Sequence, residues 1–247
     1  MQRDYEKNYH KFEKYLWWFR ARRELILRMM LPFPKESRIL EVGCSGGVLL
    51  QDLARAGYKN IEGIDISEDA VARARGRGVF SVRKASAEST GAADESIDVL
   101  IAADILEHIE NEEIALREWR RIMKPNGTLF IMVPAFMTLW SGHDLINEHK
   151  RRYRRAQFIE VLHRGGFAVQ ESSYWNFLFF FPTLFFRTLL RIIERDPKPQ
   201  AQLFHLPKLL NGIMLGILRC ENILLGLGIH FPVGVSIFAR ANKDKVV

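Results

Sequence analysis

The stretch that most constrains the fold of this chain is residues 38–66. An apolar run over residues 38–42 ends in a glycine-rich turn, residues 43–47, and a helix-like segment and a second apolar run follow, closed by Asp65. The order strand, glycine turn, helix, strand and acid is typical of the first unit of a nucleotide-binding α/β sheet. Glycines allow a ligand to approach the backbone closely, because a Cβ there would collide with it.

Two acids flank this unit. Asp65 stands at the tip of the second strand, where it can accept hydrogen bonds from both hydroxyls of a ribose. Glu41 lies two residues before the first glycine, and the glycine spacing is not the G-x-G-x-x-G of dinucleotide binders. The pattern therefore favours a ligand with a cation to hold and no pyrophosphate to cradle.

The sequences E-V-G-C-S-G-G and I-D-I-S resemble motif I and the following acid of class I S-adenosylmethionine-dependent methyltransferases. Residues 96–109, 116–118 and 123–127 extend the resemblance, as the fourth strand, the helix after it and the K-P-G-G turn of that family. Three positions depart from the family pattern. Ser45 and Asn126 replace glycines, and both replacements are mild, because serine is small and asparagine tolerates a positive φ. Ser86 stands where the family often has an acid near the adenine.

The resemblance implies a Rossmann-like sheet of seven strands with helices on both faces, the last strand antiparallel to the rest, and S-adenosyl-L-methionine as cofactor. Seven apolar segments fit these strands, at about residues 38–42, 60–64, 79–82, 97–102, 128–133, 167–173 and 234–239. In the family, Glu41 would hold the methionine ammonium and Asp65 the ribose. The full set of cofactor contacts that the resemblance implies is Arg22, Glu41, Gly43, Cys44, Gly47, Asp65, Ile66, Ala87, Glu88 and Asp104.

We expect one methyltransferase domain over residues 1–247. It comprises an N-terminal helical arm (1–34), a core (35–175), a hydrophobic helical insertion (176–233) and the last strand with its tail (234–247). The arm is predicted to be helical over residues 4–31, and its Trp17, Trp18 and Arg22 resemble an aromatic-arginine arm that covers the cofactor. The alternative is that the tryptophans only pack the arm onto the sheet.

The insertion predicts two helices, residues 177–194 and 208–228, that pair beside the site. Neither reaches the roughly 20 apolar residues without a charge that a membrane span requires. They therefore favour contact with lipid or a hydrophobic lid on the substrate, with a dimer interface or an added core layer as the alternative. Arg187, Arg191 and Arg195 recur every four residues and predict one basic stripe.

The net charge of +7 is concentrated in Arg20–Arg23 and in the run at 150–155. We expect either a solvated helix face or an anionic partner such as a lipid headgroup, and no nucleic acid, because no nucleic-acid module accompanies the charge. Only two cysteines are present and the start of the chain has no signal-peptide core, so we expect a cytoplasmic protein, peripheral at the inner face of the membrane.

Polar residues of reactive types gather in the loop at 139–153. Methyl transfer from a sulfonium depends mainly on alignment, but a hydroxyl acceptor benefits from a base, so we predict His143 or His149 for that role, with Asp104 facing the methionine end or the acceptor. The alternative is that one histidine caps the loop. We assign no metal, although Asp104, Glu107 and His108 are plausible ligands and similar runs occur in ubiquinone-type O-methyltransferases, some of which use a divalent ion.

The sequence thus predicts methyl transfer to a small or lipid-linked amphiphilic acceptor, at the cytoplasmic membrane face. One alternative is a methyltransferase for a soluble metabolite, with the insertion forming a homodimer interface. Another is a non-catalytic membrane adaptor that kept the fold, against which the intact Glu41, Gly43, Gly47 and Asp65 argue.

Overall fold

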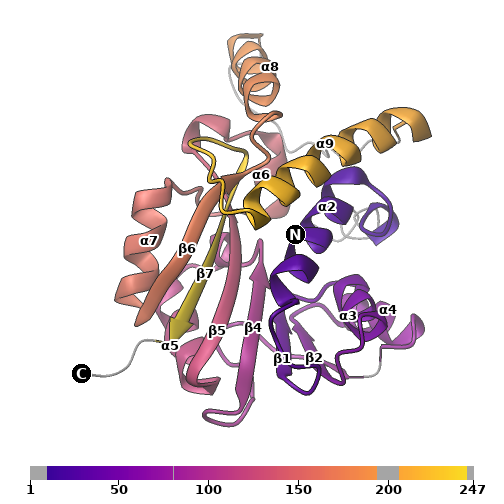
Figure 1. The fold of residues 1–247 in the computed structure, drawn as a ribbon. Coiled ribbons are helices and arrows are strands. Elements are labelled where there is room, and N and C mark those ends of the chain that lie inside the picture. The colour runs from indigo at the N-terminus through magenta and orange to yellow at the C-terminus, as the bar shows by residue number, and fades with distance from the viewer. Residues whose placement is uncertain (1–9, 80, 194–205, 244–247) are drawn as a thin grey trace.

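The computed structural model describes residues 10–79, 81–193 and 206–243, and its centre is one sheet of seven strands (Figure 1). The strands run in the order β3-β2-β1-β4-β5-β7-β6, and β7 is antiparallel to both of its neighbours. The predicted fold class is therefore confirmed. The strand bounds are β1 Arg38–Val42, β2 Asn60–Asp65, β3 Val82–Lys84, β4 Ile97–Ala103, β5 Met123–Pro134, β6 Phe167–Trp175 and β7 Ser236–Lys243.

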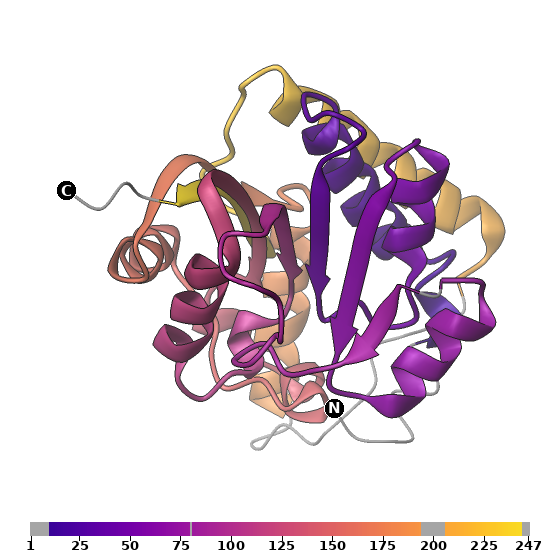
Figure 2. The ribbon, with the colours of Figure 1, turned by 90° about the horizontal axis from the view of Figure 1, so that it is seen from below.

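Helices cover both faces of this sheet (Figure 2). On one face, α5 (Glu112–Ile122) and α7 (Arg155–Arg164) pack on side chains that include Leu40 and Leu100. On the other face, α2 (Trp17–Met30) and α3 (Val48–Arg55) pack on neighbours that include Ile39 and Ile101. Successive strand residues thus point to opposite faces, and both are apolar because both faces are covered. A further helix, α4 (Glu68–Gly76), packs beside β3.

The N-terminal arm is not the continuous helix predicted over residues 4–31. Residues 4–9 lie outside the described residues, residues 10–12 are helical, and the chain turns at 13–16 before α2 begins. The Arg23 side chain explains the break, because its guanidinium donates to the carbonyl oxygens of Glu13 and, at 3.2 Å, of Lys14. Those carbonyls would otherwise accept bonds in a continuing helix.

The insertion between β6 and β7 contains two helices, α8 (Phe180–Ile193) and α9 (Lys208–Gly226), as expected from the sequence. The predicted pairing of these two helices is wrong. Helix α9 packs along α2, with which it shares an apolar cluster, whereas α8 projects from the sheet edge beside the short helix η2 (Met137–Leu139) (Figure 1). Each helix therefore packs on a separate part of the core.

Polar side chains fix the inner face of α9. Asn222 accepts from the Trp175 indole at 2.9 Å and donates to the Ala21 carbonyl at 2.8 Å. Glu221 accepts from the backbone N–H groups of Asn176 and Phe177 at the end of β6. Its pKa is raised to about 7, because burial disfavours the charge more than these hydrogen bonds favour it.

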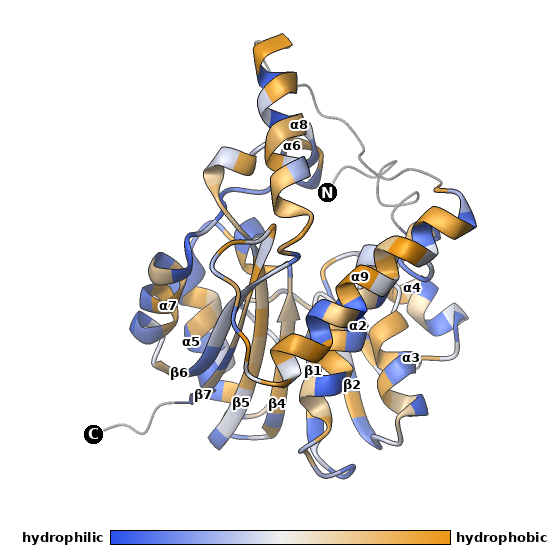
Figure 3. Cartoon of the chain, turned by 45° about the horizontal axis from the view of Figure 1, so that its top comes forward, coloured by the Kyte–Doolittle hydropathy of each residue, from blue (hydrophilic) through white to orange (hydrophobic). Residues whose placement is uncertain are grey.

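The outer faces of α8 and α9 are apolar and exposed (Figure 3). Contrary to the sequence-based expectation, α9 is long and apolar enough to cross a membrane by length and composition, although 28% of its apolar window is buried in the protein. Exposed residues on α8 include Phe181, Phe185, Leu189 and Ile192, and those on α9 include Leu209, Ile213 and Ile223.

Candidate active site

The glycine turn after β1 forms the floor of the site. Gly43 and Gly47 have φ values of +71° and +73°, which side chains other than glycine rarely adopt. A Cβ on Gly43 would meet Ile105 Cδ1 at 1.9 Å, and a Cβ on Gly47 would meet Ala74 Cβ at 2.9 Å. Both glycines were predicted for close approach of the ligand. In the structure, packing by neighbouring side chains and the left-handed backbone require them, and Gly47 does not line the cavity described below.

Ser45 and Asn126, the two replacements of family glycines, both adopt the positive φ that the missing glycines would have allowed (+49° and +63°). Ser45 also uses its side chain, since its hydroxyl donates to Glu13 Oε2 at 2.9 Å. The replacement therefore ties the turn to the N-terminal segment.

Asp65 ends β2 and is oriented by two backbone N–H groups. Its Oδ2 accepts from Ser45 N and its Oδ1 from Ser67 N, both at 2.9 Å. These bonds hold the carboxylate at the cavity wall, as expected for a ribose ligand.

Glu41 also lines the cavity, and its side chain is almost completely buried. Its Oε2 has no hydrogen-bond partner among the described residues. Burial raises the pKa of Glu41 well above its usual range, although the nearby Arg22 acts in the opposite direction. A cationic ligand group would relieve this desolvation, so the site fits the ammonium group predicted for it.

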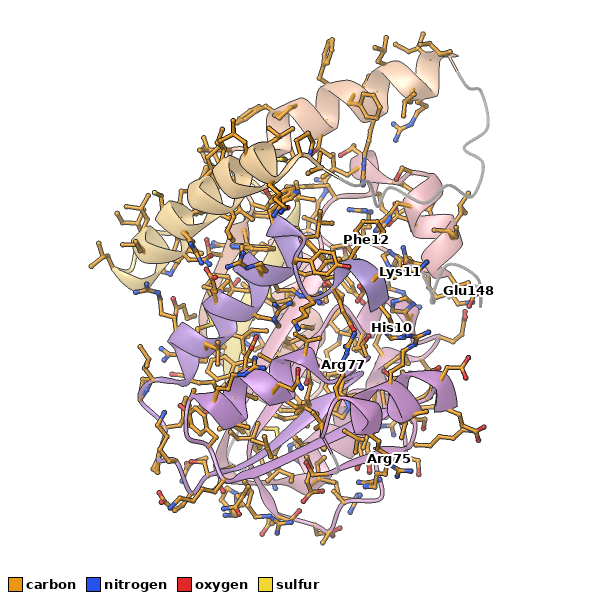
Figure 4. All side chains as sticks on the ribbon, turned by 90° about the vertical axis from the view of Figure 1, so that its right-hand side faces the viewer. His10, Lys11, Phe12, Arg75, Arg77 and Glu148 are labelled. Atoms are coloured by element: carbon orange, nitrogen blue, oxygen red, sulfur yellow. The ribbon has the colours of Figure 1, made fainter. Side chains whose placement is uncertain are left out.

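The N-terminal segment closes over the turn through residues that sequence reasoning missed. His10 and Glu13 line the cavity, and Arg77 from the end of α4 binds both the Glu13 carboxylate and the Gly46 carbonyl, the latter at 2.8 Å. His10 and Arg77 are labelled in Figure 4, and Arg77 Nη2 donates to the His10 carbonyl at 3.2 Å. No local pattern signals this cluster, because Arg77 is more than sixty residues from His10 and Glu13 in sequence.

Arg22 and Asp104 form an ion pair at the cavity wall, where the methionine end of the cofactor is predicted. Asp104 has a φ of +58° and ends β4, and the Arg22 guanidinium lies over the Trp18 ring with Cζ 4.6 Å from the centroid. Trp17 and Trp18 pack in the α2–α9 cluster, as the alternative interpretation expected, and they also line the cavity, so cofactor contact by the arm stays a prediction.

The expected adenine side is formed by Ile66, Ala87 and Glu88, all at the cavity wall. Ile66 is 72% exposed, so its side chain is available to cover a ring. The Ala87 carbonyl accepts from the buried Trp119 indole at 2.9 Å, so this segment is fixed to α5. Cys44 is buried at the same wall, and burial raises the pKa of its thiol, which stays protonated.

On the opposite side of the cavity, Asp144 of α6 (Gly142–Asn147) is the centre of a buried polar network. It accepts from His149 Nδ1 at 2.9 Å, from Arg152 Nε at 2.7 Å and from Ser141 N at 2.8 Å. Burial alone would raise the pKa of Asp144, but the bonds from His149 and Arg152 outweigh it and hold the pKa below the usual range. Asp144 is therefore a charged residue that orients His149.

The two histidines predicted as bases differ. His143 lines the cavity beside Asn147, and burial lowers its pKa to about 3, despite the nearby Asp144. Such a ring is a weak proton acceptor near neutral pH. His149 is the one paired with Asp144, and it stacks edge-on against His108 with ring centroids 4.7 Å apart. Burial also lowers the pKa of His108 to about 3.

The predicted basic surfaces are wrong in part. Arg187 does not lie on an exposed stripe: it is buried, donates to the Leu139 carbonyl and faces Asp144, and Arg195 lies outside the described residues. Arg191 donates to the Thr138 carbonyl at 3.0 Å. In the run at 150–155, Arg151 and Arg152 form ion pairs with Glu112 and Asp144. These cations hold the loop at 137–153 in place and are not a free surface.

One cavity of about 1360 Å³ joins all of these regions. It begins at Glu41 and Asp65, passes Asp104 and the histidines, and ends among apolar side chains of the insertion. The apolar end is lined by Trp17, Phe179, Pro182, Phe186, Leu190 and Met214. Small-molecule sites usually measure about 300–1,000 Å³, so this one has room for more than a cofactor.

Comparison with known proteins agrees with the site. Residues 40–131 match the family described as a methyltransferase domain. A probable S-adenosylmethionine-dependent methyltransferase of Mycolicibacterium smegmatis is 28% identical over 63% of this chain and 61% of its own length. A ubiquinone biosynthesis O-methyltransferase of Sinorhizobium fredii is 31% identical over 56% and 63%. The chain thus spans about three fifths of the curated relatives that it matches.

The fold has solved counterparts. A Haloferax volcanii methyltransferase, solved in complex with the Trm112 methyltransferase activator, superposes with a TM-score of 0.66 at 16% identity, over 99% of this chain and 96% of that one. Sequence motifs, fold and site agree: residues 40–131 form a methyltransferase domain, and the chain is similar to class I S-adenosylmethionine-dependent methyltransferases. S-adenosylmethionine is the cofactor of this family, and the buried Glu41 with its unpartnered oxygen fits the cofactor's ammonium group.

Proposed function

We propose that this protein transfers the methyl group of S-adenosylmethionine to a hydroxyl of an amphiphilic, lipid-linked acceptor at the cytoplasmic face of a membrane. The observation that carries the proposal is the continuity of the cavity from Glu41 and Asp65 to the apolar side chains of α8 and α9. A polar group would sit beside the cofactor while an apolar chain extends into the insertion.

The chemistry required of the protein is modest. The acceptor oxygen attacks the methyl carbon, the sulfur keeps the electron pair of the broken S–C bond, and the proton of the acceptor hydroxyl passes to a base or to water. Alignment of the two reactants supplies most of the rate. Glu41 would hold the ammonium group of the cofactor and Asp65 its ribose, and His149, fixed by Asp144, would face the acceptor. The Sinorhizobium fredii relative is named as an O-methyltransferase, which favours oxygen as the acceptor atom.

The membrane part of the proposal rests on the outer faces of α8 and α9. Exposed apolar residues recur along α8 at steps of three and four, so they form one face. A contiguous apolar surface of this kind favours a partner or a membrane. We propose peripheral contact. A single crossing by α9 would separate β6 from β7, which are neighbours in the same sheet.

Methyl-labelled cofactor and two extracts test the acceptor class. The protein is incubated with labelled S-adenosylmethionine and either a detergent-solubilised lipid extract or an aqueous metabolite extract. We expect label in the organic phase. Leu190→Arg, which fills the apolar end of the cavity, should abolish that labelling, whereas its exposed neighbour Leu189→Arg should retain it.

Each of the other results identifies a rival. Label only in the aqueous phase would support a soluble metabolite, and a stable dimer in solution would then explain the apolar faces. No label in either phase, with S-adenosylhomocysteine still bound in calorimetry, would support a non-catalytic adaptor.

A further inference from the structure

Glu107 is a buried acid, and burying its charged carboxylate without a partner costs free energy. It belongs to the short helix η1 (Leu106–His108) and its exposed fraction is 0%. Neither of its carboxylate oxygens has a hydrogen-bond partner among the described residues. A buried carboxylate usually has an ion pair, hydrogen bonds or a metal. Glu107 is therefore not a solvated acid.

Two imidazoles lie next to this carboxylate. One ligand atom from each of Glu107, His108 and His149 can be chosen so that all three atoms lie within 4.8 Å of one another. The nearest approach of His149 Nε2 to Glu107 Oε1 is 3.9 Å, which is too long for a hydrogen bond. Asp104, considered from the sequence as a ligand beside Glu107 and His108, is not in this group and is paired with Arg22.

The surroundings orient both rings as a metal site requires. Ligating histidines usually donate their second ring nitrogen to a carboxylate or a carbonyl, which fixes the tautomer and aims the first nitrogen. His149 Nδ1 bonds to Asp144 Oδ1 at 2.9 Å, which leaves Nε2 directed at Glu107. His108 hydrogen-bonds to the backbone of Asn147.

The two chain segments that carry these ligands are also fixed to each other. The Lys150 backbone N–H donates to the Glu107 carbonyl at 2.8 Å, and Arg151 donates to the Glu110 carbonyl at 2.9 Å. The position of His149 against Glu107 is therefore set by backbone pairing and not by the side chains alone. Such support is what distinguishes a built site from a chance cluster.

We propose that Glu107, His108 and His149 bind one first-row divalent cation, such as Zn²⁺ or Mn²⁺, with Asp144 as the residue that positions His149. Two imidazoles and a carboxylate favour this class over Mg²⁺ and Ca²⁺, which prefer oxygen ligands. To form bonds of about 2.0–2.2 Å to one ion, the three ligand atoms must move closer to one another by up to about an ångström.

The ion would lie at the cavity wall, because His108 and His149 line the cavity while Glu107 lies behind them. Three protein ligands leave an open position toward the cavity. If the proposed methyl transfer is correct, an acceptor hydroxyl can take that position, where the ion lowers its pKa and its proton leaves to water. In that case the lone pair of His149 Nε2 binds the metal ion, so His149 is a ligand and does not act as the base.

Calorimetry with the chelator-treated, full-length protein tests the site, using Zn²⁺, Mn²⁺ and Mg²⁺ as separate titrants. We expect one Zn²⁺ or Mn²⁺ per chain and much weaker Mg²⁺. Glu107→Gln, which keeps the shape, and His149→Ala should each weaken binding at least about 100-fold, and Asp144→Asn about 10–100-fold. His163→Ala, an exposed histidine on α7, is the matched control and should bind as the wild type does.

Binding of S-adenosylhomocysteine, measured on every variant, shows that each remains folded. A folded wild type that binds neither Zn²⁺ nor Mn²⁺ overturns the proposal, and so does equal binding by wild type and Glu107→Gln. Metal binding without any methyl transfer would support the metal site and contradict the proposed function. Transfer at an unchanged rate in chelator would overturn the role of the ion in the reaction.

Discussion

The two sides of the cavity are built in different ways. On the cofactor side, Asp65 is held by backbone N–H groups of Ser45 and Ser67, and all three lie between residues 45 and 67. On the acceptor side, Asp144, His149 and Arg152 satisfy one another through side chains, and Glu107 joins them from a different loop. Backbone geometry leaves a sequence signature, whereas a side-chain network depends on which loops meet.

This difference predicts separable effects. Substitutions on the acceptor side should change turnover and leave cofactor affinity intact, and substitutions on the cofactor side should do the reverse.

The largest effect is expected for His149→Ala. Loss of this ring, whether it acts as a base or as a metal ligand, should lower turnover by about 10²–10⁴. His143→Ala should cost less, because burial lowers the pKa of His143 to about 3 and makes it a poor proton acceptor. Initial rates of label transfer with both variants, at saturating cofactor, test this. A larger loss for His143→Ala would reverse the assignment.

Asp65→Ala should weaken S-adenosylhomocysteine binding by about 1.5–3 kcal/mol, the usual value of hydrogen bonds to a charged group. Calorimetry measures the change, and Asp69→Ala, an exposed acid in the first turn of α4, is the control. Unchanged affinity in Asp65→Ala would remove Asp65 from the cofactor site.

Glu221 should make the anchoring of α9 depend on pH. Its pKa is raised from 4.5 to about 7 in the folded protein, so the folded state binds the proton more tightly than the unfolded state. Its contribution is fully present below about pH 4.5 and is lost as pH rises through 7.

Urea unfolding of wild type and Glu221→Gln at pH 5 and pH 8 isolates this contribution. The stability of wild type relative to the variant should fall over that range by on the order of 1–3 kcal/mol. A relative stability that is constant, or that rises with pH, contradicts the assignment.

The smallest effect concerns membrane contact. Flotation with anionic liposomes should show a several-fold lower bound fraction for the double variant Phe185→Ser and Ile192→Ser, because both side chains are exposed on α8. Salt should change binding by less than about two-fold, since Arg187 is buried and Arg191 is bonded to carbonyls. Glu160→Ser on α7 is the control. Strong salt dependence would restore the basic surface expected from the sequence.

The sequence by itself determined the sheet, the cofactor and the positions of Glu41, Gly43 and Asp65. These features depend on the pattern of apolar residues along each strand and on a turn that closes within a few residues. Residues close together in sequence therefore encode them. The backbone conformation at Ser45 and Asn126 was predictable in the same way, whereas the bond from the Ser45 hydroxyl to Glu13 was not.

The tertiary structure alone decided how charged residues are used. A run of arginines has the same sequence pattern whether it faces lipid or holds a loop, and Arg187 and Arg152 hold the loop. The same is true of His10 and Arg77 over the glycine turn, and of His149 against Glu107. In each case the partners come from distant segments, and whether burial, an ion pair or a ligand satisfies a charge depends on which side chains the completed fold brings together.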